Sequence, residues 1–83
     1  MKFSKRSTYG LRAMARLAKY WKEKNVSLAE ISNQEQISKK YLEQIFIKFK
    51  EAGLVKSEKG KYGGYRLSRK PEEISVFEII ETL

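Results

Sequence analysis

The chain has 83 residues, which is enough for one small domain, and we expect residues 1–83 to form a single one. Its 18 Lys and Arg against ten acidic residues give a formal net charge of +8, which indicates a polyanionic partner, either nucleic acid or an anionic membrane surface. The absence of Cys, His and Asp excludes disulfides, thiolate or imidazole metal sites and the usual general bases, so we expect a binding module and not an enzyme.

The first predicted helix spans residues 7–24. Apolar side chains recur there at spacings of three and four residues, which is typical of a helix with one buried face. The expected buried stripe consists of Leu11, Met14, Ala15, Ala18 and Trp21. A small basic cluster stands at the start of this helix and consists of Lys2, Lys5 and Arg6.

Two further helices are predicted from their capping residues, over residues 28–34 and 39–52. Ser27 and Glu30 have the spacing of a capping box, in which each side chain accepts a hydrogen bond from the other residue's amide. Ser38 is the expected N-cap of the longer helix, and Gly53 is the expected left-handed residue after it. Two helices joined by a short turn predict a helix-turn-helix.

A basic hairpin is predicted directly after this pair, over residues 54–68. Short β-type segments flank a glycine-rich tip at residues 59–64. A last helix is predicted over residues 76–83, with Ser75 and Glu78 as a capping box and Val76 on its buried face. The predicted fold class is therefore mainly α with a small β-hairpin, a winged helix-turn-helix.

The helix over residues 38–52 carries the side chains best suited to read DNA bases in the major groove. Gln44 can pair with adenine through two hydrogen bonds, and Glu43 can accept from the amino group of cytosine. Basic residues in a first helical turn oppose the helix dipole but suit a bound phosphate. The predicted DNA-binding residues of this helix are Ser38, Lys39, Lys40, Tyr41, Glu43, Gln44 and Lys48.

The hairpin adds a second basic region, since residues 56–70 hold six bases against Glu58 alone. We expect Lys59 and Lys61 to contact the DNA backbone or the minor groove, and Lys5 and Arg6 to contact the backbone only. The alternative for both regions is an ordinary solvated surface of lysines.

Several motifs together resemble the Rrf2 family of bacterial winged-helix transcriptional regulators. They are Tyr9, the segment 27–31, Ile37-Ser38-x-x-Tyr41-Leu42-Glu43-Gln44-Ile45-Phe46, Gly53-Leu54-Val55, and Gly60-x-x-Gly63-Gly64-Tyr65. The resemblance implies that the helix at residues 38–52 enters the major groove, with Tyr41, Glu43 and Gln44 at the DNA and Lys59 near the minor groove. Lys59 replaces a frequent Arg of the family, and Gln36 stands where Gly is common.

The resemblance also implies a longer parent protein with a C-terminal sensor and dimerisation region. Many members hold an iron–sulfur cluster on three Cys beyond the fourth helix, followed by a long dimerisation helix. This chain has no Cys, so we expect no metal or cofactor on these residues, while the resemblance allows a cluster in the parent. We expect the parent to be a homodimer on a two-fold operator, and this chain alone to be a monomer.

Together these patterns predict sequence-specific binding of double-stranded DNA in transcriptional regulation, as a repressor. No apolar run is long enough to cross a membrane and no signal-peptide core follows the basic start, so we expect a cytoplasmic protein without a membrane partner. The alternative is a winged-helix module that docks another protein. It would require an exposed apolar patch, for which the sequence offers Ile47 and Tyr62.

Overall fold

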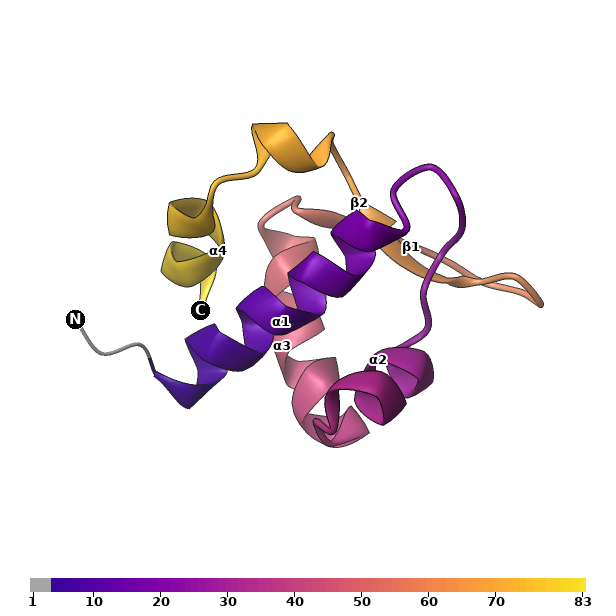
Figure 1. Ribbon diagram of the computed structural model, residues 1–83, viewed down its shortest axis with the longest axis horizontal. Helices are drawn as coiled ribbons and strands as arrows, with labels where there is room; N and C mark the ends of the chain where they lie inside the picture. The colour runs from indigo at the N-terminus through magenta and orange to yellow at the C-terminus, as the bar shows by residue number, and fades with distance from the viewer. Residues whose placement is uncertain (1–3) are drawn as a thin grey trace.

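The computed structural model of the chain describes residues 4–83, in which helices build a small body and a hairpin projects from one side (Figure 1). The elements are α1 (Lys5–Lys19), α2 (Leu28–Glu35), α3 (Lys39–Glu51), β1 (Val55–Glu58), β2 (Gly64–Leu67), a 3-10 turn (Pro71–Glu73) and α4 (Val76–Thr82). The predicted winged helix-turn-helix is confirmed, and α2, α3, the hairpin and α4 each lie within about two residues of their expected bounds, whereas the 3-10 turn was not predicted. Among the described residues, no helix has the length and apolar character needed to cross a membrane.

Helix α1 differs most from its prediction, because it starts earlier and stops at Lys19. The hydroxyl of Ser4 caps its start by accepting a hydrogen bond from the Ser7 amide, at 3.0 Å. At the other end, the chain leaves the helix through turns, and Lys22 adopts a left-handed φ of 66°. Trp21 therefore lies in the turn region beyond the helix, and the predicted span 7–24 is wrong at both ends.

The buried stripe of α1 is also displaced from the predicted one and consists of Ser7, Gly10, Ala13, Met14 and Leu17. Leu11 and Ala18 are only half-buried, and Ala15 is exposed. Small residues on the buried face let α1 lie close to its neighbours. A Cβ on Gly10 would meet the side chain of Leu83 and come within 3.1 Å of Phe49.

The helix-turn-helix consists of α2 and α3, and their N-caps form as expected. The hydroxyls of Ser27 and Ser38 accept from the amides of Glu30, at 3.0 Å, and Tyr41, at 3.1 Å. The predicted return half of the first capping box is wrong, because the Glu30 carboxylate accepts from Lys24 Nζ, at 2.8 Å, instead. A nearby cation thus competes successfully with a backbone amide for a carboxylate.

The turn between α2 and α3 contains a residue in the left-handed region, Gln36, with φ 56°. Glycine adopts this conformation more easily, so the residue type carries a cost of up to about 1 kcal/mol. Helix α3 then packs the expected stripe into the core, namely Leu42, Ile45, Phe46 and Phe49. Its end is followed by Gly53 with φ 75°, as the sequence predicts.

The hairpin is a two-stranded antiparallel sheet that a third segment extends. Val55 pairs with Leu67 and Glu58 with Gly64. Val26, from the α1–α2 connection, exchanges two backbone hydrogen bonds of 2.8 Å with Tyr65. Gly64 permits this approach, because a Cβ there would lie 2.7 Å from the Val26 carbonyl and φ is 139°.

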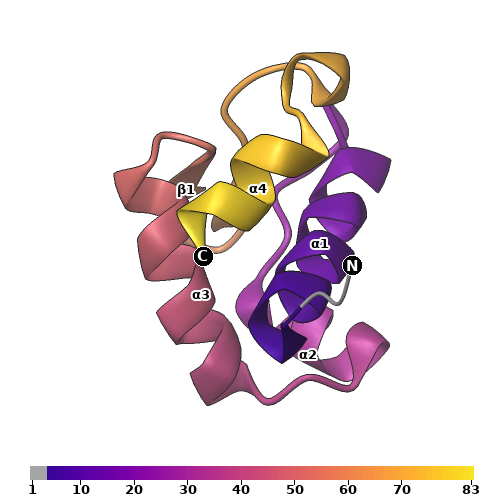
Figure 2. The ribbon, with the colours of Figure 1, turned by 90° about the vertical axis from the view of Figure 1, so that its left-hand side faces the viewer.

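Helix α4 closes one end of the molecule, where it lies between α1 and α3 (Figure 2). Its capping box is complete, since Ser75 Oγ accepts from the Glu78 amide at 3.0 Å and Glu78 accepts from the Ser75 amide at 3.1 Å. Ile79 is buried, whereas Val76 is exposed. The prediction that Val76 faces the core is therefore wrong, because at the first turn of α4 only one side meets the body.

Candidate nucleic-acid interface

The outer face of α3 displays most of the residues expected to bind DNA. Because the apolar stripe of α3 faces the core, the residues between its members point outward. The exposed residues of this face are Lys39, Lys40, Glu43, Gln44, Ile47 and Lys48. The helix therefore presents hydrogen-bonding side chains flanked by cations on a rigid, packed element.

Ser38 and Tyr41 are placed differently from the other residues, since both have internal partners. The Ser38 oxygen accepts the Tyr41 amide at the start of α3, so its main contact is structural. The Tyr41 ring is half-buried and meets the ring of Tyr9 edge to face, with centroids 5.6 Å apart. Tyr41 thus connects α3 to α1 while its side chain remains partly exposed.

The start of α1 and the start of α3 share an open hollow of about 400 Å³. Its lining residues are Arg6, Ser38, Lys40, Tyr41 and Gln44. Lys5 lies close by, with its Nζ 5.6 Å from the centre of the Tyr9 ring. The structure thus brings together the expected residues of two helices around a polar, cationic surface that can take an anionic group such as phosphate. Lys2 lies outside the described residues.

A carboxylate clamp, formed by Glu35 with Arg12 and Arg16, joins α1 to the helix-turn-helix. The carboxylate of Glu35, at the end of α2, accepts hydrogen bonds from Arg12 Nε at 3.1 Å and from Arg16 Nε at 2.9 Å. Arg12 Nη2 also donates to the backbone carbonyl of Glu35. The hydrogen bond from Arg16 and, to a smaller extent, the hydrogen bond from Arg12 hold the pKa of Glu35 below its usual value. With its side chain only 14% exposed, Glu35 is the anchor of this contact.

This clamp was not visible in the sequence, because its partners are separated by 19 and 23 positions. It does not line the hollow but holds α2 against α1, which is one of the two helices that form the hollow. A second contact extends the clamp toward the interface, since the Arg12 guanidinium lies 5.5 Å from the ring centre of Tyr9.

The hairpin formed by β1, β2 and the tip between them is the wing of this fold. It carries the other expected DNA-binding residues, Lys59 and Lys61, and both are exposed. The tip turn closes with a backbone hydrogen bond of 3.0 Å from the Gly63 amide to Gly60. Below the tip, Arg66 forms an ion pair with Glu58. Since the nearest acid is already paired, the tip keeps its positive charge.

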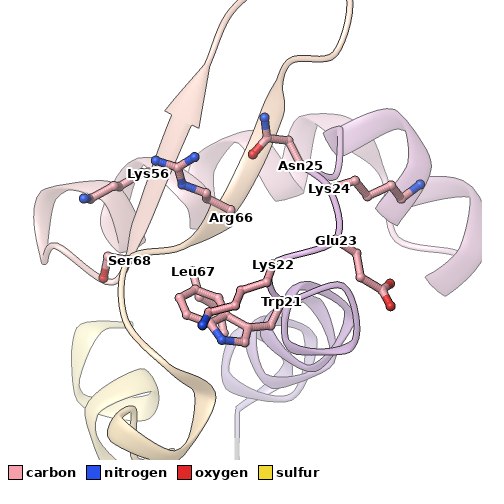
Figure 3. Close-up of a pocket in the computed structure, with 9 residues that line it drawn as sticks. All are labelled: Trp21, Lys22, Glu23, Lys24, Asn25, Lys56, Arg66, Leu67 and Ser68. Atoms are coloured by element: carbon pink, nitrogen blue, oxygen red, sulfur yellow. The ribbon is translucent and has the colours of Figure 1, made fainter.

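A larger hollow of about 480 Å³ lies between the turn after α1 and the strands, as Figure 3 shows. Trp21 and Lys22 approach it from the turn, while Lys56 and Arg66 approach it from the strands. None of the residues expected to bind DNA lines it. We assign it no role.

The described residues do not fit a metal or an iron–sulfur cluster. Within residues 4–83, no three carboxylate, imidazole or thiol side chains gather in a group that could hold a metal ion. The sequence supplies no Cys or His as a donor. A thiolate-ligated cluster would need donors from outside this chain.

Comparison with known proteins agrees with this architecture. Residues 3–83 match the family described as Rrf2, Iron-dependent Transcriptional regulator. The chain is 46% identical over 85 aligned positions to the HTH-type transcriptional regulator IscR of Cereibacter sphaeroides, covering 100% of this chain and 55% of that protein. It therefore spans little more than half the length of that curated relative.

Solved structures show the same fold. CymR, the global cysteine regulator of B. subtilis, has a TM-score of 0.96 and 42% identity, with 100% of this chain and 64% of the other covered. T. potens IscR has a TM-score of 0.94 and 43% identity, with coverages of 100% and 61%. The resemblance inferred from the motifs is thereby confirmed, and the chain belongs to the Rrf2 family of transcriptional regulators.

Proposed function

We propose that this chain is the DNA-binding module of a cytoplasmic transcriptional repressor and that it binds double-stranded DNA sequence-specifically. The observation that carries the proposal is the arrangement of α3. Its outward face presents Glu43 and Gln44 beside a cationic hollow to which α1 contributes Arg6. Groups that can discriminate bases therefore stand next to groups that can hold phosphates.

Phosphate contacts position the protein on the duplex and come from the rim of the interface. In this proposal they are supplied by Lys5, Arg6, Ser38, Lys39, Lys40, Tyr41 and Lys48. The hollow between α1 and α3 would hold one phosphate near the α3 start, where helix amides also favour an anion. The clamp on Glu35 holds α1 against α2, the helix that precedes α3, and so supports the placement of Arg6 beside that phosphate.

Base contacts come from α3 in the major groove, where Gln44 suits adenine and Glu43 suits cytosine. The wing follows α3 directly and carries Lys59 and Lys61 toward the backbone or the minor groove. Lys59 is a point charge without the planar fork of arginine, so its contribution is attraction and not bidentate recognition.

For the whole parent protein we propose a homodimer on a two-fold operator. The relatives named above are longer than this chain, so the parent has room for a pairing region outside residues 1–83. Two copies would place two α3 helices in successive major grooves. A bound iron–sulfur cluster would belong to the same outside region, since these residues offer no thiolate.

The alternative of a protein-docking module has less support. Ile47 and Tyr62 are both exposed, but they lie on different elements and each is flanked by lysine. A docking surface has an apolar centre with charge at its rim. On the outer face of α3, by contrast, Ile47 is the single large apolar side chain among charged and polar ones.

The proposal is tested by selecting duplexes from a random library on the immobilised chain, then measuring affinity for a selected and a scrambled duplex by fluorescence anisotropy. Measurements at about 50 and 200 mM salt separate phosphate attraction from base recognition. We expect a defined motif and tighter binding of the selected duplex at both salt concentrations. Equal affinity for both duplexes at both concentrations would contradict sequence-specific binding.

A further inference from the structure

A large aromatic side chain stands fully in solvent at the tip of the wing. Tyr62 is 83% exposed, the most exposed of the large hydrophobic residues in residues 4–83. Single exposed apolar residues are common on protein surfaces and need no explanation by themselves. The surroundings of Tyr62 are what make it informative.

The backbone that carries Tyr62 is held in place on three sides. Asn25 Nδ2 donates to the Tyr62 carbonyl at 3.0 Å, and the same amide lies 3.3 Å from Glu58. The Val26–Tyr65 bridge follows three residues later, and the Gly63 amide closes the tip turn on Gly60. The ring is therefore exposed on an anchored tip, so little backbone entropy remains to be lost when the ring binds a partner.

The charges around the ring limit what it can bind. Lys61 Nζ lies 5.6 Å from the centre of the ring, and Lys59 stands on the other side of Gly60. The acid of this segment, Glu58, is paired with Arg66. An aromatic surface within a positive field suits a partner that combines an apolar face with fixed negative charge.

The sugar-phosphate wall of a DNA minor groove has this combination, because deoxyribose carbons alternate with phosphates. Minor-groove proteins commonly pair basic side chains with apolar ones that pack into the groove. The wing continues directly from α3, whose outer face we propose for the major groove. A tip contact in the adjacent minor groove thus extends one continuous interface.

We infer that Tyr62 is a DNA contact, with its ring packed against deoxyribose in the minor groove beside the phosphates held by Lys59 and Lys61. The inference rests on the proposed DNA-binding function and assigns different contributions to the residues of the wing. The lysines supply the part of the affinity that salt screens, and Tyr62 supplies a part that does not depend on salt. No kink or base insertion is required.

The test compares the chain with Tyr62→Ala and Tyr62→Phe on a selected duplex. Phe77→Ala is the matched control, because Phe77 is another exposed aromatic residue but lies on α4. Affinity is measured over about 50 to 200 mM salt, since the slope counts phosphate contacts. Hydroxyl-radical cleavage, which attacks deoxyribose from the minor groove, maps the sugars that each variant protects.

We expect Tyr62→Ala to bind about tenfold more weakly with an unchanged salt slope, the loss that follows from removing roughly 60 Å² of buried apolar surface. It should lose protection of the sugars outside the α3 site, whereas Tyr62→Phe and Phe77→Ala should behave like the parent chain. Circular dichroism confirms that the variants remain folded.

Three results would overturn the inference. They are an unchanged affinity for Tyr62→Ala, a changed salt slope, or an equal loss in Tyr62→Phe, which would assign the effect to the hydroxyl. If the unsubstituted chain itself fails to prefer the selected duplex, the proposed function fails instead, so the two failures are distinguishable.

Discussion

At the scale of single residues, the proposed interface predicts that Glu43 and Gln44 determine which bases the chain prefers. Both side chains are exposed on α3, so replacing them removes no core contact. We expect Glu43→Ala or Gln44→Ala to lose about 1–3 kcal/mol on the selected duplex and little on a scrambled one, because a base contact is made only at the right sequence. Anisotropy titrations on both duplexes provide the measurement.

Glu51→Ala is the matched control for these two variants, since Glu51 is an exposed carboxylate at the far end of the same helix. It should leave the ratio of the two affinities unchanged. A uniform loss on both duplexes for Glu43→Ala and Gln44→Ala would assign these residues to positioning instead of base recognition.

Local features at this scale could be predicted from the sequence, whereas distant pairs could not. Ser27, Ser38 and Ser75 cap their helices because the bond partner is three residues away, a distance that spacing alone reveals. Glu35 could not be matched to Arg12, since many acids and bases on the two helices are equally plausible pairs before the fold is known. For Glu30 the local prediction was wrong, because its carboxylate accepts from Lys24 and not from the Ser27 amide.

At the scale of elements, the Glu35 clamp should make stability depend on acid pH. Because its hydrogen-bonded arginines lower the folded pKa of Glu35 below 4.5, the clamp stabilises the fold fully above that value. The stabilisation disappears as the pH falls through the lowered pKa. Glu78, whose pKa is lowered by the Ser75 amide and then by Arg69, changes in the same direction.

We therefore expect Glu35→Gln to cost about 1–2 kcal/mol at pH 7, after allowing for partial exposure of the arginines, and to reduce the loss of stability below about pH 4.5. Urea unfolding at several pH values measures both effects, with Glu51→Gln as control. An unchanged pH profile would show that the carboxylate does not stabilise the contact between α1 and α2.

The wing makes a separate prediction about salt. Lys59→Ala and Lys61→Ala should each weaken binding to selected and scrambled duplexes alike and reduce the salt slope by about one, because each lysine neutralises one phosphate. Lys19→Ala, an exposed base at the end of α1, is the control and should change neither quantity. If Lys59→Ala leaves affinity and slope unchanged, the wing does not hold the backbone as proposed.

Element boundaries were predictable where local signals determine them and not where packing does. Helix α3 has a capping serine, a regular apolar stripe and a terminal glycine, and its span was predicted within one residue. Helix α1 stops at Lys19 so that the chain can turn and Val26 can pair with Tyr65. That pairing joins residues far apart in sequence, so the local apolar pattern could not reveal it. The pattern runs on to Trp21 and therefore placed the end of the helix too late.

At the scale of the whole molecule, this chain should be a monomer. The exposed large hydrophobic residues in residues 4–83 are Ile47, Tyr62, Val76 and Phe77, and only the last two are neighbours. A stable interface usually buries about 800 Å² on each partner around a shared apolar centre, whereas these residues stand in three separate parts of the fold, namely α3, the hairpin tip and α4. The net charge of +8 adds repulsion between copies.

Sedimentation at tens of micromolar measures the oligomeric state, and we expect a single species of 9.7 kDa. The affinity of the single chain for one half-site of DNA should be weak and sensitive to salt. A monomer lacks the gain in avidity of about 10²–10⁴-fold that linking two modules can give. A stable dimer at this concentration would show that the pairing surface lies within these 83 residues.

The central claim is that α3 and the wing together form one DNA-binding face. Titration of the ¹⁵N-labelled chain with the selected duplex, followed by backbone amide chemical shifts, tests it along residues 4–83 except at Pro71. We expect the largest changes at residues 38–44 of α3, at the tip residues 59–63 and at the start of α1, with little change in α4. Changes centred on α4 and the adjoining side of α1, with α3 unaffected, would contradict the account.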